Sequence, residues 1–399
     1  MAKIDVYLKS ELVGRLEKTG QQYVFSYHHN AISALSLTMP LRTQSYTNES
    51  LHPIFQMNLP EGHLRQVIER ATAKQYGSDD LTMLAILGDH QIGQLGFAIE
   101  GQPLLLSKQN KPDLKALLGS EDANLFDQLL KNFACFSGVA GVQPKVLLEI
   151  NDSNQRLTLP LKSYIVKSWG DDYPHLACNE FVCLSLAKLA GLEVSPFYLS
   201  DNAKLLITER FDLNRTQQRL GFEDFAVLQA KSTKQKYDAS LESCANTIKQ
   251  YVSAEFKSKA LHDFFKLTII NYLVGNGDAH LKNSGILYDN LDGYQLGQLP
   301  KCKRRFAPIF DIVSTQAYLP NDMMALSLTG SKRWPKFKVL EKFAITHCDL
   351  SKKQIKKICD DIEIAAQEVW PILEKLENTH PEFIQISVKI KELISRKIN

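Results

Sequence analysis

The chain has 399 residues, of which 44% are hydrophobic and 23% charged, and its formal net charge is +3 at pH 7. This composition is typical of a soluble globular protein, and the length predicts two or three packed units that each bury a core. No apolar run approaches the roughly 18 residues that a membrane span needs. The charged N-terminal segment lacks the apolar stretch of a secretory signal, so we expect a cytoplasmic protein without a membrane partner. The small net charge does not call for a nucleic-acid partner.

The first hundred residues are predicted to be rich in strands. Apolar and polar residues alternate, between short turns, in segments 3–8, 12–18 and 22–28. Helical spacing follows in segments 61–74 and 79–89, and segment 91–101 returns to a strand pattern. We therefore expect a β-rich N-terminal subdomain over residues 1–105.

A second unit is predicted over residues 125–215. Its strand candidates are segments 145–150, 156–169 and 204–212. A helix is predicted over 175–191, because the apolar spacing stops at Gly191 and Pro196 follows. Cys178 and Cys183 lie on this helix, and their five-residue offset places them on different faces, so we expect reduced thiols rather than a metal site.

Residues 216–399 are predicted to form a helical third unit. Strand signals become rare there, and Phe383, Ile386 and Ile390 mark a final helix at three- and four-residue spacing. A sheet-rich first half followed by a helical second half indicates an α+β fold, with a cleft expected where the halves meet.

Residues 274–285, VGNGDAHLKNSG, contain three side chains suited to catalysis or metal binding: Asp278, His280 and Asn283. A helix is predicted to run into this loop and a strand to follow it. Asp278 and Asn283 have the five-residue spacing of the catalytic Asp and the metal-binding Asn in the protein-kinase signature H-R-D-x-x-x-x-N. In that arrangement the carboxylate meets the attacking hydroxyl, and the amide oxygen holds a magnesium ion. His280 is expected to brace the loop or to approach the phosphates.

A second acidic residue is needed to complete such a metal site. Asp311 is predicted at the end of an apolar strand, 28 residues beyond Asn283, where it would act as the Asp of the kinase D-F-G motif. Ile312 and Val313 replace the Phe and Gly of that motif, and the wide gap allows an extra hairpin. Spacing alone therefore leaves open a metal-dependent hydrolase built on Asp278, His280 and Asp311.

Features earlier in the chain favour the kinase interpretation. The segment YIVK ends in Lys167 and resembles the kinase V-A-I-K lysine that holds the phosphates. Gly138 and Gly141 would let backbone N–H groups approach phosphate, and Lys145 adds a charge beside the next strand.

The remaining parts of a kinase follow in the expected order. Glu180 lies on the predicted helix after Lys167 and could be its ion-pair partner. The segment ITERFD resembles the hinge at which adenine hydrogen-bonds the backbone, at Glu209 and Phe211. Each element alone is weak, but together they have the order that a kinase fold needs, across a transition from sheet to helix.

Several segments together resemble the HipA family of serine/threonine kinases, the toxins of bacterial type II toxin–antitoxin systems. They are VAGVQPK, YIVK, NEFVCLSLAKLAGL, ITERFD, NGDAHLKN and FDIVS, with MNLPEGHLR and LGDHQIGQLGF in the N-terminal part. The resemblance covers nearly the whole chain. It implies a protein-kinase-like two-lobed fold, with a β-rich N-terminal subdomain, a kinase-like N-lobe and an all-helical C-terminal catalytic domain.

The resemblance also implies roles for individual residues. The phosphate loop would be Ala140, Gly141, Val142, Gln143, Pro144 and Lys145, and Lys167 would hold the phosphates of ATP. The adenine hinge would be Glu209, Arg210 and Phe211. Asp278 would be the catalytic base, and His280, Leu281, Lys282, Asn283 and Phe310 would line the nucleotide site. Asn283 and Asp311 would bind Mg²⁺.

One position departs from the family pattern. A serine that is autophosphorylated in the family stands three residues before the glycine that matches Gly141, and Gly138 occupies that place here. Ser137 is the nearby hydroxyl and becomes the candidate site of autophosphorylation. A phosphate there would add about −1.5 to −2 charges beside the nucleotide phosphates, which disfavours ATP binding.

The resemblance implies partners as well. They are a small helix-turn-helix antitoxin, operator DNA contacted mainly through that antitoxin, and a protein substrate of the aminoacyl-tRNA synthetase type. The leading hypothesis is thus a Mg-ATP-dependent protein kinase. The alternatives are a non-catalytic binding module that acts with the antitoxin as a co-repressor, and the metal-dependent hydrolase.

Overall fold

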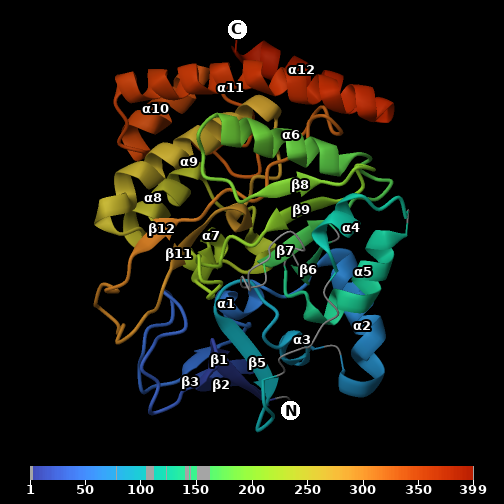
Figure 1. The fold of residues 1–399 in the computed structure, drawn as a ribbon. Helices are drawn as coiled ribbons and strands as arrows, with labels where there is room; N and C mark the ends of the chain where they lie inside the picture. The colour runs from blue at the N-terminus through green and yellow to red at the C-terminus, as the bar shows by residue number, and fades with distance from the viewer. Residues whose placement is uncertain are drawn as a thin grey trace. The chain divides into compact units, whose positions relative to one another are not determined.

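The computed structural model describes residues 3–77, 79–104, 112–122, 124–139, 143, 145–150 and 162–398. The chain divides into two compact units, and each is assembled from three separate stretches (Figure 1). Unit 1 comprises Met1–Ser168, Asp212–Thr233 and Leu287–Lys303, and unit 2 comprises Trp169–Phe211, Lys234–Ile286 and Arg304–Asn399. The division into 1–105, 125–215 and 216–399 stays a prediction. No helix in the described part of the chain is both long and apolar enough to cross a membrane.

Unit 1 begins with an antiparallel sheet of five strands in the order β4-β3-β2-β1-β5. Its strands are β1 (Lys3–Leu8), β2 (Glu11–Thr19), β3 (Gln22–Tyr27), β4 (Tyr46–Asn48) and β5 (Leu95–Ile99). The turns between the first three strands are tight because Lys9 and Gly20 have positive φ, at 59° and 61°. Alternating side chains such as Ile4, Val6 and Leu16 are buried, as the sequence pattern predicts.

Short helices accompany this sheet within unit 1. They are α1 (Pro53–Gln56), α2 (Gly62–Tyr76), α3 (Asp80–Leu87), α4 (Leu114–Leu118), α5 (Leu125–Phe133) and α7 (Phe225–Leu228). Asp79 caps α3, because its carboxylate accepts hydrogen bonds from the N–H groups of Leu81 and Thr82. A second antiparallel pair in unit 1 joins β6 (Lys145–Ile150) to β7 (Lys162–Lys167). Residues 156–161 of the predicted strand lie outside the described residues.

A buried carboxyl group holds together three stretches of unit 1. Glu223, on β10 (Gly221–Asp224), accepts hydrogen bonds from Ser36 Oγ at 2.8 Å, Leu37 N at 2.7 Å and Tyr288 Oη at 2.6 Å. A side chain at Gly221 would overlap the Tyr288 ring, since a Cβ there would lie 2.1 Å from it. Because an unpaired polar group is costly in this interior, the three donors fix the 36–37 loop against β10.

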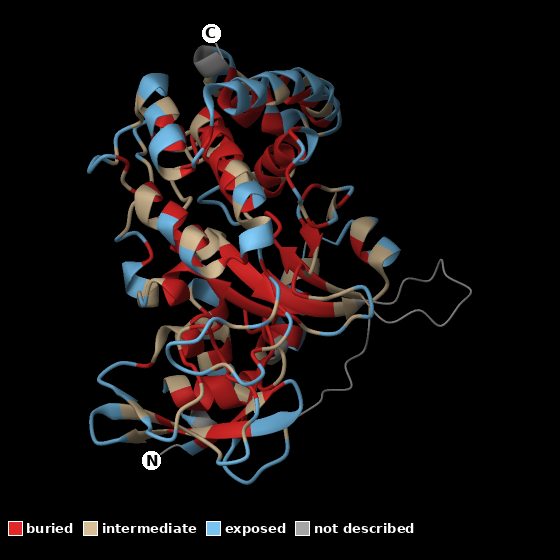
Figure 2. Cartoon of the chain, turned by 90° about the vertical axis from the view of Figure 1, so that its left-hand side faces the viewer, coloured by how far each residue is buried: buried red, intermediate tan, exposed pale blue. Residues whose placement is uncertain are grey.

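Unit 2 is predominantly helical. It contains α6 (Leu176–Leu189), α8 (Leu241–Tyr251), α9 (Ala254–Val274), α10 (Phe337–His347), α11 (Lys352–Thr379) and α12 (Ile384–Ile398). α11 packs on α6, and α12 packs on α9 (Figure 1). The helices of unit 2 carry buried residues on their inward sides and exposed residues on their outward sides (Figure 2). Apolar positions such as Ile358, Ile362 and Ile390 form this core.

Strands are also present beyond residue 215, so the expected all-helical C-terminal part needs a correction. They are β10 in unit 1, β11 (Gly285–Tyr288) and β12 (Arg304–Phe306). Earlier in the chain, β8 (Phe197–Leu199) pairs with β9 (Leu206–Glu209) in unit 2. β11 is the strand predicted to follow the 274–285 loop, whereas β10 and β12, with four and three residues, are too short to give a recognisable alternation. Apart from this correction, the antiparallel sheets and helices confirm the α+β class.

Glu223 is expected to make stability depend on pH. Burial raises its pKa from 4.5 to about 7, although its three hydrogen bonds act in the opposite direction. Between pH 4.5 and about 7, the folded state keeps a proton on Glu223 that the unfolded state releases. The contribution of Glu223 to the unfolding free energy is therefore fully present below pH 4.5 and lost as the pH rises through about 7. Glu223→Gln cannot ionise and should remove this dependence, since the hydroxyls of Ser36 and Tyr288 can donate or accept.

Urea unfolding of both proteins at pH 5 and pH 8 tests this expectation. Between these pH values, wild type should lose on the order of 2–3 kcal/mol of unfolding free energy relative to Glu223→Gln. Parallel pH profiles for the two proteins would contradict an elevated pKa for Glu223.

Candidate active site

The loop with Asp278 begins where α9 ends, and two glycines there make room for a neighbouring segment. Gly275 caps α9 with φ of +64°, and a Cβ on it would lie 2.5 Å from Gln316 Oε1. A Cβ on Gly277 would lie 2.0 Å from the Asp322 carboxylate and 2.4 Å from the Met323 carbonyl oxygen. These glycines therefore permit close packing between chain segments.

Hydrogen bonds fix the same loop to residues 314 and 315. Ser314 Oγ donates to the Val274 carbonyl oxygen at 2.6 Å, and Thr315 Oγ1 donates to that of Gly275 at 3.0 Å. Gly277 N donates back to Thr315 Oγ1 at 2.7 Å. The segment after Asp311 and the loop before Asp278 are thus held in register with each other.

Asn283 and Asp311, predicted to share a metal ion, are in direct contact. Asn283 Nδ2 donates to Asp311 Oδ2 at 2.7 Å, although the residues are 28 positions apart. The Asn283 amide oxygen accepts from His280 N at 3.0 Å, and Asn283 N donates to the His280 carbonyl oxygen at 3.0 Å. His280 therefore braces the loop through its backbone. Asp311 does not end a strand as predicted, because it follows an isolated bridge between Ile309 and Val194.

Tyr237 is a residue of this site that the sequence analysis missed. Its hydroxyl donates to Asp278 Oδ1 at 2.6 Å, and its ring packs edge-on against His280 with centroids 5.2 Å apart. Lys332 Nζ donates to the Tyr237 carbonyl oxygen at 3.0 Å, and Leu281 N donates to that of Lys236 at 3.1 Å. The 236–237 segment therefore restrains both the Asp278 carboxylate and the backbone after it.

The predicted hinge and the predicted metal-binding segment meet through an aromatic stack. The rings of Phe211 and Phe310 lie 4.5 Å apart with an interplanar angle of 14°. Glu209 ends β9, and its N–H donates to the Pro196 carbonyl oxygen at 2.8 Å. Offset stacking of this kind adds roughly 0.5–1.5 kcal/mol beyond the buried area. Arg210, which lies between Glu209 and Phe211 in the sequence, is half-buried.

Helix α6 is tied to the metal-binding segment by a buried amide. Asn179 Nδ2 donates to the Ser314 carbonyl oxygen at 3.0 Å, and Ser314 N donates to Asn179 Oδ1 at 2.8 Å. Glu180 follows Asn179 and is fully buried. Lys167 belongs to the other unit, so the predicted ion pair between Glu180 and Lys167 stays a prediction.

The cysteines of α6 do not have the properties of metal ligands or nucleophiles. Burial raises the pKa of Cys178 to about 12, and it also raises the pKa of Cys183. Metal binding and nucleophilic attack both require the thiolate. Both thiols therefore remain protonated at neutral pH.

Unit 1 carries the residues predicted to hold phosphate. Lys145 and Lys167 are directly opposite each other in the β6–β7 pair, so their side chains lie on the same face, and both are buried. Gln143 Nε2 donates to the Ser168 carbonyl oxygen at 3.2 Å, which links the end of the loop to the end of β7. Ala140, Gly141, Val142 and Pro144 lie outside the described residues.

Ser137, the candidate phosphate acceptor, is fully buried. Its Oγ donates to the Phe133 carbonyl oxygen at 2.8 Å and accepts from Leu147 N at 2.9 Å. Phosphorylation would require both hydrogen bonds to break. Autophosphorylation of Ser137 stays a prediction, and the conformation described here does not expose the hydroxyl.

Unit 2 alone brings together the residues predicted for catalysis, metal binding and the hinge. His280, Leu281, Lys282 and Asn283 form or flank the short helix η3 (Leu281–Asn283), and Leu281 is fully buried. Among the described residues, no group of three or more His, Cys, Asp or Glu side chains could hold a metal ion. This geometry does not support the hydrolase built on Asp278, His280 and Asp311.

Two family models match the chain and together cover most of it. The model of the HipA-like C-terminal domain matches residues 137–370, and that of the HipA N-terminal domain matches residues 4–98. We refer to residues 4–98 below as the N-terminal domain.

Individual relatives have kinase names. Y4mE of Sinorhizobium fredii, named as a kinase, is 29% identical over 305 residues, which cover 71% of this chain and 69% of that protein. The serine/threonine-protein kinase toxin HipA of Shewanella oneidensis is 26% identical over 311 residues, which cover 70% of each chain.

A solved structure matches nearly the whole chain. It is the Shewanella oneidensis complex of HipA, HipB and operator DNA, with a TM-score of 0.69 and 18% identity, covering 98% of this chain and 96% of that one. This likeness confirms the predicted kinase-like fold.

Proposed function

Because the chain belongs to the HipA family, we propose that it is a HipA-type kinase toxin that transfers the γ-phosphoryl group of Mg-ATP to a protein serine or threonine hydroxyl. The observation that carries the proposal is the contact between Asn283 and Asp311, with Asp278 in the same braced loop. A carboxylate for the acceptor hydroxyl and two oxygen ligands for a metal are the groups that phosphoryl transfer needs at this place.

The donor set fits magnesium. Asn283 offers an amide oxygen and Asp311 a carboxylate, and Mg²⁺ takes such hard oxygen ligands from one or two side chains while keeping several waters. A bound Mg²⁺ would offset charge on the phosphates. The hydrogen bond places the Asn283 amide beside the Asp311 carboxylate, but the Asn283 oxygen accepts from His280 N, so the amide would turn to offer this oxygen to Mg²⁺.

Asp278 is proposed to accept the proton of the substrate hydroxyl and to orient its oxygen for attack. Lys145 and Lys167, on one face of the β6–β7 pair, are proposed to hold the triphosphate, together with backbone N–H groups of residues 140–145. Glu209, Arg210 and Phe211 are proposed as the adenine hinge, and the Phe211–Phe310 stack supports their position.

The proposed acceptor class is the aminoacyl-tRNA synthetases, which the family resemblance implies. The proposed partner is a small helix-turn-helix antitoxin. Support for the partner comes from the matching structure, in which the Shewanella protein is bound to HipB and operator DNA. The net charge of +3 favours DNA contact mainly through the antitoxin.

Asp278→Asn should abolish phosphoryl transfer while leaving ATP binding within about twofold of wild type, because the amide keeps the shape but cannot accept the proton. Transfer is measured with radiolabelled ATP and a synthetase substrate, and binding by calorimetry with Mg-ATP. Asp289→Asn, outside the catalytic loop, is the matched control. Equal turnover by Asp278→Asn and wild type would refute the catalytic role.

Tyr237→Phe should lower kcat about tenfold and change KM for ATP by less than about twofold, because the lost hydroxyl donates to the carboxylate of the proposed catalytic base, Asp278. Tyr173→Phe is the control, since Tyr173 is an exposed tyrosine of the same unit that packs edge-on against Tyr318. If Tyr237→Phe raises KM for ATP and leaves kcat unchanged, this positioning role is excluded.

The binding-module alternative is tested with the proposed helix-turn-helix antitoxin, if one is encoded beside this chain, and with the DNA upstream of its gene. We expect a gel shift only when the antitoxin is present, and further retardation when the chain is added to that complex. A shift by the chain alone would contradict DNA contact through the antitoxin. If the wild-type chain binds the complex of antitoxin and DNA but transfers no phosphoryl group, the co-repressor interpretation is favoured over the kinase.

A further inference from the structure

The start of the predicted glycine loop is joined to the N-terminal domain by backbone contact. Gly138 N donates to the His90 carbonyl oxygen at 2.7 Å, and Gln91 pairs with Gly138 as an isolated parallel bridge. Both partners belong to unit 1. Gly138, two positions before the predicted phosphate-binding segment, is therefore held by residues from another family-defined domain of the chain.

This contact leaves no room for a side chain at position 138. A Cβ there would lie 2.6 Å from the His90 carbonyl oxygen and 2.6 Å from Gln91 Cγ. The first of these is a backbone atom, which cannot rotate away. Any residue other than glycine must push the start of the loop off the N-terminal domain. The contact explains why residue 138 is a glycine, and this explanation does not require Gly138 to bind phosphate.

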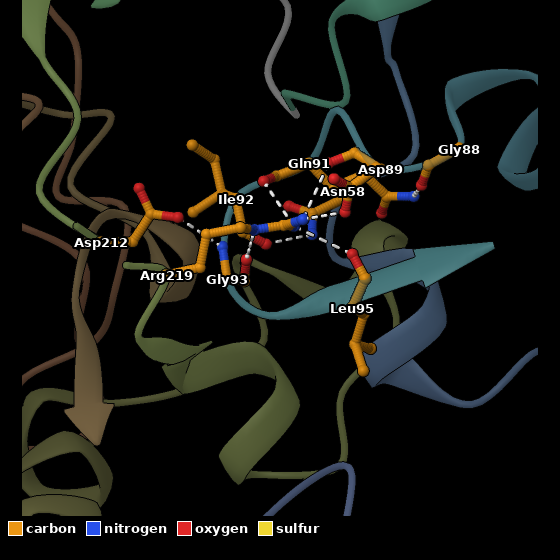
Figure 3. Close-up of polar contacts among 9 residues, drawn as sticks. All are labelled: Asn58, Gly88, Asp89, Gln91, Ile92, Gly93, Leu95, Asp212 and Arg219. Atoms are coloured by element: carbon orange, nitrogen blue, oxygen red, sulfur yellow. Dashed lines mark hydrogen bonds and ion pairs between the residues drawn. The ribbon is translucent and has the colours of Figure 1, made fainter. Parts of the chain in front are cut away.

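The residues on either side of His90, Asp89 and Gln91, are in turn held by one arginine. Figure 3 shows the Arg219 side chain among the carbonyl groups of the 88–95 segment, which is the stretch from Gly88 to Leu95. Arg219 donates to the carbonyl oxygens of Gly93 at 2.6 Å, Asp89 at 2.9 Å, Leu95 at 2.9 Å and Gln91 at 3.1 Å, and it pairs with the Asp89 carboxylate. All five guanidinium donors therefore bond to this one segment.

A second contact fixes the 88–95 segment to the chain that leaves the predicted hinge. Gly93 N donates to Asp212 Oδ2 at 2.6 Å, and Asp212 is fully buried (Figure 3). Asp212 directly follows Phe211, the last residue of the proposed adenine hinge. One segment of the N-terminal domain thus contacts both Gly138, at the start of the glycine loop, and Asp212, the residue that follows the proposed hinge in the sequence.

We propose that the 88–95 segment is a positioning element for nucleotide binding, with Arg219 as the positioning residue that keeps it in place. The segment fixes Gly138 and thereby the start of the loop that holds the triphosphate. This inference rests on the proposed kinase function. It gives the N-terminal domain a part in ATP affinity, in addition to any contact that the domain makes with partners.

The first test compares two glycine substitutions. Gly138→Ala should raise KM for ATP at least about tenfold and change kcat by less than about threefold, because the loop is displaced while Asp278 and its braces are untouched. Gly170→Ala is the matched control, since a Cβ at Gly170 meets nothing within 4 Å. It should behave as wild type.

The second test removes the arginine. Arg219→Gln should also raise KM for ATP about tenfold, because about four carbonyl hydrogen bonds and an ion pair are lost or weakened. Arg215→Gln is the control, because Arg215 is an exposed arginine four residues before Arg219 in the same stretch of unit 1, Asp212–Thr233. If both substitutions act through the 88–95 segment, the double variant Gly138→Ala with Arg219→Gln should raise KM far less than the product of the single effects.

Hydrogen exchange gives a readout that does not need catalysis. Without nucleotide, the amides of Gly138 and Leu147 should exchange at least about tenfold faster in Arg219→Gln than in Arg215→Gln, while the amides of α9 keep their wild-type rates. Normal KM in Gly138→Ala, multiplicative effects in the double variant or unchanged exchange at Gly138 would each overturn the inference. If wild type proves inactive as a kinase, the proposed function fails, and the exchange rates alone decide whether Arg219 holds the loop.

Discussion

The hydrogen bond between Asn283 and Asp311 is the interaction on which the candidate site depends. It joins two residues that are 28 positions apart: Asn283 ends the one-turn helix η3, and Asp311 lies in a segment without helix or strand. Their positions are fixed because the backbone groups around them are satisfied by side chains: Ser314 and Thr315 bond the carbonyl oxygens of Val274 and Gly275. An irregular segment can place a functional group accurately only when its polar backbone is paired in this way.

How far the sequence predicts this arrangement depends on the kind of signal each element carries. The long helices α9 and α11 and the first three strands have clear periodicity, whereas β10 and β12 are too short to show one. Asp278 and Asn283 are predictable because their residue types and spacing match a chemical requirement. Tyr237 has no such spacing to Asp278, and its contact depends on the tertiary path of the chain between α7 and α8.

A sequence motif can identify a glycine correctly although the structure requires that glycine for another reason. Sequence reasoning assigns Gly138 to phosphate binding, because glycine-rich turns let backbone N–H groups approach an anion. In the structure, Gly138 is needed for the close approach of the His90 carbonyl group, and Gly277 for that of Asp322 and Met323. The residue that excludes a side chain lies far away in the sequence in both cases, so spacing within the motif cannot identify it.

The two lysines of the β6–β7 pair bear on the choice between a kinase and a non-catalytic binding module. Lys145 and Lys167 are cross-strand neighbours on one face, and both are buried. Like charges placed directly opposite each other repel, and burial strengthens that repulsion, so the arrangement costs folding free energy unless negative charge is close to both. A triphosphate supplies several negative charges at once. The shared face of Lys145 and Lys167 therefore fits the proposed binding of Mg-ATP, and this fit favours the kinase proposal over a module that only binds an antitoxin.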